Sequence, residues 1–451
     1  MRDYIGGILK SPKFWKGVGS VILAILVYSF MPADVSESVR RMSFIFTVAA
    51  FFWALEVVPL YTTSLLIVLM EVLFLCQPGG AESISYKVFL VPFGSPIIML
   101  FFGGLMIAVA LGKYHIDVMV VRRLMKLFGK KPYFIMLGFM VTAAFLSMWM
   151  SNTATTAMMI AMVLPLLKQV PKESPFRTAL VLAVPFGANI GGIATPVGTP
   201  PNAIAIGILS NMGINLSFVG WMKMAFPLAV LLLAIGSVIL YFMFPSTSEE
   251  IDLHIEVKKK FNHITGLVSL IVIGTIGLWL TSSFHHLPSA VVALLAVGAL
   301  YLFHLLDKSD LKRVDWDVLV LMWGGLALGK GLEVSGLTDW IVTLPIFQQE
   351  GVLLVVVFAF LSLAIASFMS HTATANLVIP IVMAIPGENN VLLAVTVALA
   401  CSFAMAFPIS TPPNAIAFAT DMVKTKDMIK AGALISVISL IIMLLGYQLI
   451  I

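Results

Sequence analysis

Two short clusters of hydroxyl and amide side chains interrupt long apolar runs of this chain. One is Ser151–Thr153, with Ser147 one helical turn before it, inside the run 133–167, and the other is Ser370–Thr372, inside the run 352–385. An unsatisfied polar group in an apolar environment is costly, so these groups are expected to bind one another or a ligand. Where a helix begins, its free N–H groups favour an anion, and the carbonyls that end the preceding helix favour a small cation. The alternative is that the hydroxyls only bond to helix carbonyls or hold helices together.

A second pair of signals is the sequence Thr-Pro-Pro-Asn, which occurs at 199–202 and again at 411–414. Two consecutive prolines remove two backbone donors and disfavour the helical conformation of the residue before them. The chain is therefore predicted to unwind inside a membrane crossing at Gly198–Pro201 and at Ser410–Pro413. Carbonyls freed by unwinding are cation ligands, which makes Ser410 a candidate residue of a cation site. A simple proline kink is the alternative, but the break occurs twice at equivalent places.

Both pairs of signals belong to an internal repeat with an offset of about 220 residues. The matched segments, in order, are Phe102–Gly104 with Trp323–Gly325, Ala110–Lys113 with Ala327–Lys330, Ser151–Thr155 with Ser370–Thr374, and Thr199–Ala205 with Thr411–Ala417. An odd number of crossings between equivalent segments makes the two halves inverted relative to each other. Inverted repeats with paired broken helices are typical of secondary transporters whose site lies at the bilayer midplane.

The elements that position these residues are predicted to be membrane helices. Of the 451 residues, 60% are hydrophobic and 11% are charged, about half the charged share of a soluble domain. At about 20 apolar residues per crossing, roughly ten or more membrane segments are expected, which argues against a nucleic-acid-binding protein or a soluble enzyme. The two cysteines, Cys76 and Cys401, offer neither a disulfide framework nor a cysteine metal site.

The distribution of charge predicts the topology of an all-α integral membrane protein. Because the runs 133–167 and 352–385 are each broken at their centres, we expect about 11 transmembrane helices plus two re-entrant hairpins. With this assignment 22 of the 27 Lys and Arg residues fall on one side, which puts the N-terminus in the cytoplasm and the C-terminus outside. The basic segment 114–131 is expected to be an amphipathic helix on the cytoplasmic surface, with a solvated linker as the alternative.

Four parts of the chain follow from this topology. Residues 1–131 are expected to form scaffold helices and the surface helix, 132–246 the first half of a transport unit, 247–350 further scaffold helices, and 351–451 the second half of the transport unit. Each half of the transport unit would contain one re-entrant hairpin and one unwound helix.

His371 is the ionisable residue that the repeat places at a hairpin tip, where the first repeat has Asn152. An ionisable residue at that depth is a functional hypothesis by default. By contrast, Glu56, Lys113 and Lys330 lie near predicted helix ends, where the charged group of a long side chain reaches the membrane interface.

At these motifs the chain resembles the divalent anion:sodium symporter family, over essentially its whole length. The resemblance implies a homodimer of elevator type, in which the hairpins and unwound helices move against the other helices. It implies that the substrate carboxylates are contacted by residues of the two tips and the two breaks, namely Ser151, Asn152, Thr153, Thr199, Pro200, Ser370, Thr372, Thr411 and Pro412. His371 joins this set by its place in the repeat. The resemblance also implies one sodium ion among Ser147, Ser151, Asn152 and Gly198.

A second sodium site does not follow as simply from the resemblance. The family usually has an Asn where this chain has His371, and the hydroxyl residue expected four positions before Ser370 is Ala366. A neutral imidazole is a reluctant sodium ligand, and an imidazolium would bring its own positive charge. Sodium-independent exchange of dicarboxylates, with His371 replacing the second cation, is therefore the alternative to sodium symport.

The function expected from the sequence is secondary active transport of small divalent anions, C4-type dicarboxylates first among them, across the plasma membrane. Sodium is the expected coupling ion, the lipid bilayer is the expected surroundings, and neither a cofactor nor a nucleic-acid partner is expected. Sulfate or citrate transport remains open. An integral-membrane enzyme is disfavoured because the sequence shows no paired carboxylates, metal-ligand cluster or Ser/His/Asp set at one depth, and a channel because paired tips without charged rings suggest a closed binding site.

Overall fold

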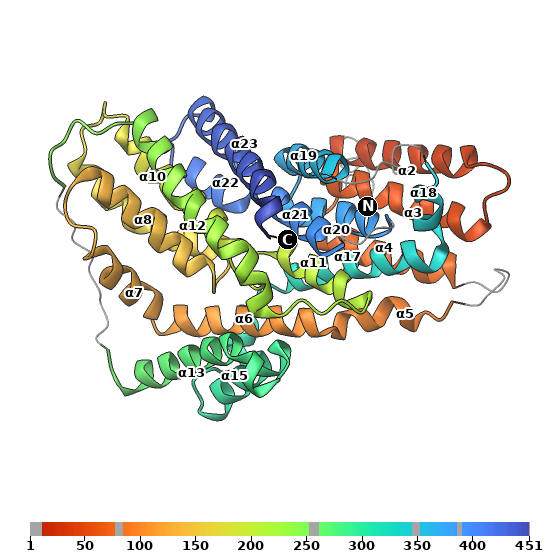
Figure 1. The fold of residues 1–451 in the computed structure, drawn as a ribbon, viewed down its shortest axis with the longest axis horizontal. Coiled ribbons are helices and arrows are strands. Elements are labelled where there is room, and N and C mark those ends of the chain that lie inside the picture. The colour runs from red at the N-terminus through yellow and green to blue at the C-terminus, as the bar shows by residue number, and fades with distance from the viewer. Residues whose placement is uncertain (1–10, 77–83, 252–260, 345–351, 386–389, 451) are drawn as a thin grey trace, which may run out of the picture. The chain divides into compact units, whose positions relative to one another are not determined.

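The computed structural model describes residues 11–76, 84–251, 261–344, 352–385 and 390–450, and its regular elements in those ranges are helices (Figure 1). The domain boundary expected at 350–351 lies outside the described residues. Contacts divide the chain into two compact units, the first made of Met1–Ile98, Ile204–Ile214 and Trp316–Cys401, the second of Met99–Ala203, Asn215–Asp315 and Ser402–Ile451.

Most elements fall wholly or largely within one unit. The first unit holds α2 (Pro12–Phe30), α3 (Glu37–Leu55), α4 (Leu60–Leu75), α5 (Lys87–Leu90), the 3₁₀ helix η1 (Val91–Gly94), most of α11 (Pro200–Asn211), α17 (Trp316–Ser335), α18 (Leu337–Val342), α19 (Val352–Phe368), α20 (His371–Met383) and nearly all of α21 (Asn390–Ser402). The second holds most of α6 (Pro96–Lys113), then α7 (Ile116–Met125), α8 (Pro132–Ser147), α9 (Asn152–Leu166), the 3₁₀ helix η2 (Leu167–Gln169), α10 (Phe176–Gly192), α12 (Phe218–Met243), α13 (His263–Leu280), α14 (Ser282–His285), α15 (Ser289–Leu302), α16 (Lys308–Leu311), α22 (Pro412–Phe418) and α23 (Thr425–Ile450).

The polar and proline signals of the sequence coincide with helix ends. Helix α8 ends at Ser147 and α9 begins at Asn152, and α19 ends at Phe368 and α20 begins at His371. Helix α10 ends at Gly192 and α11 begins at Pro200, while α22 begins at Pro412. Breaks are therefore present at both Ser-x-Thr clusters and before both proline pairs. The bounds expected for the second kind of break are wrong, because the unwound residues are 193–199 and 403–411, while the prolines at 200–201 and 412–413 are the first residues of α11 and α22, where a missing N–H costs no helical hydrogen bond. Seven described helices are long and apolar enough to cross a membrane by length and composition, and shorter apolar helices include α8, α19 and α20.

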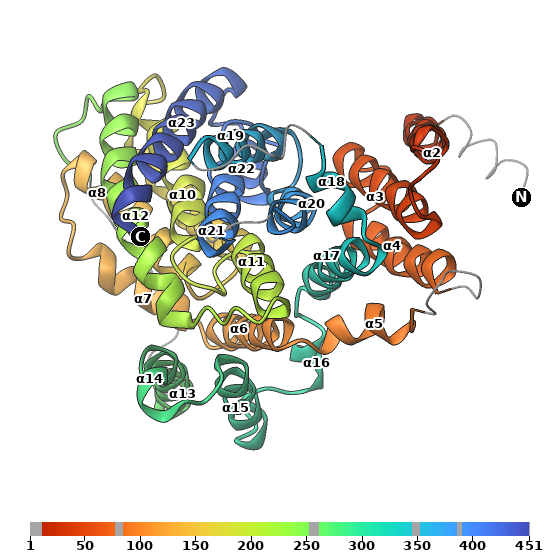
Figure 2. The same ribbon diagram turned by 45° about the vertical axis from the view of Figure 1, so that its right-hand side comes forward.

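The first unit is built on α17, which packs against α4 and α20 (Figure 2). Two adjacent glycines of α17 allow this approach: a Cβ atom on Gly324 would collide with Ser64 of α4, and one on Gly325 with Asn376 of α20. The buried core around them includes Trp53, Ile67 and Leu328. The diglycine of the repeat is therefore a point of close helix packing.

The second unit is built on the close packing of α8 and α10. Gly187 and Gly191 of α10 are four residues apart, so they lie on one face of the helix. A Cβ atom on either would collide with the backbone of α8, at Met140 and Ala144 respectively. This small-residue spacing lets the two backbones meet and holds the first hairpin tip beside the end of α10, where the chain unwinds.

Candidate functional site

Ser151 begins the second half of the first hairpin. It is the N-cap of α9, and its Oγ accepts a hydrogen bond from the backbone N–H of Ala154 at 3.2 Å. The first-turn N–H groups of α9 and the positive end of its dipole therefore lie at the tip. Thr153 is exposed in this first turn, and the structure gives its hydroxyl no protein partner among the described residues. This tip can bind an anion through N–H and O–H donors.

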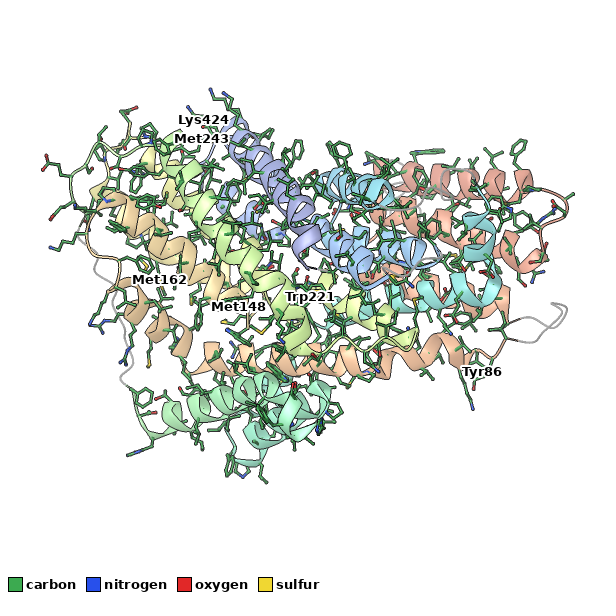
Figure 3. All side chains as sticks on the ribbon, in the orientation of Figure 1. Tyr86, Met148, Met162, Trp221, Met243 and Lys424 are labelled. Atoms are coloured by element: carbon green, nitrogen blue, oxygen red, sulfur yellow. The ribbon has the colours of Figure 1, made fainter. Side chains whose placement is uncertain are left out.

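The unwound segment between α10 and α11 reaches the same tip. Thr195 Oγ1 donates to the carbonyl oxygen of Met148, which lies in the break before α9, at 2.6 Å. Trp221 Nε1 of α12 donates to the carbonyl oxygen of Ile193 at 2.9 Å, and Figure 3 labels both Met148 and Trp221. Thr199 is buried at the end of the segment, immediately before Pro200. The unwound segment is thus fixed on two sides within one unit.

Three of the four residues predicted for the first sodium ion meet around Gly192. The buried Ser147 Oγ donates to Asn152 Oδ1. A Cβ atom on Gly192 would lie 2.7 Å from Asn152 Oδ1, and one on Gly198 would collide with the Gly192 carbonyl. The cluster offers neutral oxygen atoms that can act as cation ligands, beside unwound backbone, and transporters hold sodium in sites of this kind. Ser151, the fourth residue, instead uses its hydroxyl to cap α9.

Asn202 and Asn414 hold the two unwound segments, and neither is among the residues that the sequence predicts for the site. Asn202 Nδ2 lies within hydrogen-bonding distance of the carbonyl oxygens of Gly192, Ile193 and Thr195, at 3.0, 3.2 and 2.8 Å. Asn414 Nδ2 lies likewise 2.9 Å from the Met405 carbonyl oxygen and 3.1 Å from that of Phe407. Both side chains are fully buried. The signal that could have identified them is the asparagine that ends both Thr-Pro-Pro-Asn sequences.

The second break is tied to α10. Asn189 Nδ2 donates to Thr411 Oγ1 at 3.4 Å and to Asn414 Oδ1 at 3.3 Å. Thr411 caps α22 by accepting from the Asn414 N–H, with Pro412 as the first residue of that helix. Ser410 Oγ donates to the Phe407 carbonyl oxygen at 2.7 Å, so its proton is already used and only its oxygen lone pairs remain for a cation.

The second hairpin tip lies in the first unit. Ser370 precedes α20, whose first two residues, His371 and Thr372, are each 8% exposed. Asn376, one turn further on, donates to the Leu321 carbonyl oxygen of α17 at 3.0 Å and so anchors α20. Ala366, the counterpart of Ser147 in the repeat, is fully buried. The structure therefore places Ser370, His371 and Thr372 in one unit and the remaining predicted site residues in the other.

A cavity of about 190 Å³ borders Ser151 within the second unit. Its lining includes three charged side chains that the sequence did not single out, Asp117, Arg313 and Asp315. Burial raises the pKa of the Asp117 carboxyl, while the N–H of Val118, which donates to Asp117 Oδ1 at 2.8 Å, acts in the opposite direction. The cavity therefore places a guanidinium group and two carboxyl groups in the same lining as Ser151.

The sequence pattern of the family described as "Sodium:sulfate symporter transmembrane region" matches residues 12–449. The chain belongs to this family. The resemblance to divalent anion:sodium symporters is thereby confirmed: the protein is a multi-pass membrane transporter of anions and not an enzyme.

Relatives in this symporter family match along most of the chain. A transporter of Schizosaccharomyces pombe is 32% identical over 94% of this chain, which spans about half, 51%, of that protein's length. The sodium-dependent dicarboxylate transporter SdcS of Staphylococcus saprophyticus is 30% identical over 95% of this chain and 89% of its own.

Solved transporter structures share the fold of this family member at low sequence identity. The Neisseria gonorrhoeae efflux pump MtrF has a TM-score of 0.57 at 12% identity, with 94% of this chain and 96% of that chain covered. The Alcanivorax borkumensis transporter YdaH has a TM-score of 0.54 at 12% identity, with 86% and 98% covered.

Proposed function

We propose that this transporter carries small dicarboxylates, C4-type first, across the plasma membrane together with sodium. The observation that carries the proposal is the cluster of Ser147, Asn152 and Gly192. It brings neutral oxygen ligands for a cation to the same tip at which α9 begins. A sodium ion there would offset the charge of a carboxylate bound at the same tip. The name of the staphylococcal relative, a sodium-dependent dicarboxylate transporter, supports the same cargo and coupling ion.

The anion is held by donors rather than by fixed cations in this mechanism. At the first tip, the proposed donors to the substrate carboxylates are Ser151, Thr153 and the first N–H groups of α9, and at the second tip they are Ser370, His371 and Thr372. The two breaks would contribute Thr199 with Pro200 and Thr411 with Pro412. Alternating access is of elevator type in a homodimer: the hairpins and unwound helices, within 132–246 and 351–451, move against the scaffold segments 1–131 and 247–350.

The sodium part of the proposal is tested with Ser147→Ala. The variant loses a hydroxyl ligand, so we expect the sodium concentration for half-maximal succinate uptake into proteoliposomes to rise about tenfold. Ser210→Ala, which removes an exposed hydroxyl from α11, is the matched control. Preloaded unlabelled succinate should drive counterflow of labelled succinate, as a carrier requires. Unchanged sodium activation in Ser147→Ala, or no counterflow, would contradict the proposed function.

Sodium-independent exchange is the second candidate, and the second tip favours it. At the first tip Ser147 donates to Asn152. The equivalent residues of the second repeat are Ala366, which has no hydroxyl, and His371, which has no amide oxygen. In this scheme the imidazole either donates to the dianion or carries a positive charge beside it, in place of a second sodium ion.

The two candidates are separated by uptake measured against sodium concentration and pH. Symport through the first sodium site alone predicts a shallow sodium dependence with a pH effect in the parent, whereas sodium-independent exchange predicts uptake that needs no sodium. In both cases the double variant Ala366→Thr with His371→Asn is expected to gain a steeper sodium dependence. His371→Asn alone is the control, because Ala366 still lacks a hydroxyl. Steep sodium dependence without a pH effect in the parent would contradict exchange and indicate sodium symport with a complete second cation site.

The proposed orientation, with the N-terminus in the cytoplasm and the C-terminus outside, makes a labelling prediction. In a Cys76→Ser background, a cysteine at Met212 should react with an impermeant reagent in intact cells, and cysteines at Glu173 and Lys308 only after permeabilisation. All three positions are exposed on the protein surface, whereas their neighbours Ser174 and Asp310 are buried. Labelling at position 173 in intact cells would be incompatible with a re-entrant first hairpin.

A further inference from the structure

A basic cavity lies at the end of the first hairpin, away from both tips. Its volume is about 280 Å³, and Lys168, Lys172 and Arg177 line it together with the apolar side chains Leu164, Leu167, Val170 and Met422. These residues come from the end of α9, from η2 and the turn after it, from the start of α10, and from the loop before α23, all within the second unit. Lys424, labelled in Figure 3, marks that loop.

The lining of the cavity carries positive charge and includes no acidic side chain among the described residues. Arg177 Nη1 donates to the carbonyl oxygens of Leu167 and Val170 at 2.6 and 3.0 Å, and Nη2 lies 3.3 Å from the Met422 sulfur. These acceptors fix the guanidinium without neutralising it. Within the described ranges, no carboxylate forms an ion pair with Arg177, Lys168 or Lys172. Glu173 and Asp421 are neighbours in sequence but do not line the cavity.

The lining combines two chemistries that a lipid headgroup requires. Two exposed ammonium groups and one guanidinium favour a phosphate, to which Arg presents a planar set of donors. Leu164, which lines the cavity and is 39% exposed, offers apolar surface to the part of the ligand next to the phosphate. Basic pockets between membrane helices bind anionic headgroups when they lie at the membrane surface, and this cavity forms where the apolar run 133–167 gives way to charged residues.

We propose that this cavity binds the phosphate of an anionic phospholipid headgroup. The bound phosphate bridges the end of the first hairpin, the start of α10 and the 420–424 loop, which Arg177 and Thr178 already join through Met422. Binding therefore stabilises the folded protein and ties this part of it to the membrane surface. The inference is independent of which anion is transported, so failure of one proposal leaves the other intact.

The test is the thermal stability of the purified full-length protein in detergent, titrated with dioctanoyl phosphatidylglycerol, with dioctanoyl phosphatidylcholine or with inorganic phosphate. We expect phosphatidylglycerol to raise the melting temperature of the parent, and the double variant Lys168→Gln with Lys172→Gln to need about tenfold more lipid for the same shift. The double variant Lys308→Gln with Lys312→Gln is the matched control, because it removes the same charge from exposed positions outside the cavity.

Each contrary result overturns the lipid site in a different way. Equal stabilisation by phosphatidylcholine would show that the phosphatidylglycerol charge is not recognised. Equal titrations for the parent and the Lys168→Gln, Lys172→Gln variant would exclude this cavity. Stabilisation of the parent by inorganic phosphate without an effect of phosphatidylglycerol would assign the site to a soluble phosphate instead. Arg177 is left unchanged because its bonds to two backbone carbonyls also support the fold.

Discussion

Replacing Asn202 by alanine is expected to lower the free energy of unfolding by about 2 kcal/mol and to abolish transport. The amide nitrogen that is removed shares its two N–H donors among three buried carbonyl oxygens, those of Gly192, Ile193 and Thr195, and a hydrogen bond is worth about 1 kcal/mol. Gly192 lies against Asn152, so a loosened segment also disturbs the proposed sodium site. Asn414→Ala should cost about 2 to 3 kcal/mol, because it removes the contacts of its amide nitrogen with two carbonyl oxygens and also Oδ1, which accepts from Asn189.

Thermal unfolding in detergent and succinate uptake measure this effect. Asn211→Ala is the matched control, since Asn211 is exposed at the end of the same helix and should melt like the parent. A melting temperature of Asn202→Ala equal to that of Asn211→Ala would show that the amide does not support the unwound segment.

Replacing Thr153 or Thr372 by alanine is expected to weaken dicarboxylate binding about tenfold to a hundredfold, with little loss of stability. Each change removes one hydrogen bond to a charged carboxylate, worth roughly 1.5 to 3 kcal/mol. The structure supports this choice because neither hydroxyl has a protein partner among the described residues. Folding should therefore be preserved, in contrast to Asn202→Ala.

The measurement is the affinity for succinate from thermal stabilisation and from uptake, with Thr62→Ala as the control outside the repeat. If Thr153→Ala and Thr372→Ala both bind succinate as tightly as Thr62→Ala does, the tips are not the substrate site. If only one of them binds more weakly, the substrate is held mainly by that tip.

The sequence by itself determined the class of protein and the places where its helices break. Composition alone requires a membrane protein, and the proline pairs at 200–201 and 412–413 mark where a new helix begins, because proline lacks the backbone N–H that is unpaired in a first turn in any case. Ser151 likewise caps α9 through atoms three residues apart. Properties of this kind depend on neighbours along the chain, so they can be predicted without coordinates.

Only the tertiary structure decided which of these breaks are held together, and by what. Asn189 meets Thr411 across 222 positions of sequence, and Gly191 matters because it lies against the backbone of Ala144. The amide of Asn202 looks like an ordinary polar group in the sequence, and its role follows from three carbonyl oxygens that the unwound backbone turns toward it. The basic cavity likewise needs Met422 beside Arg177. Contacts between distant segments depend on how whole helices pack, which local pattern and propensity do not specify.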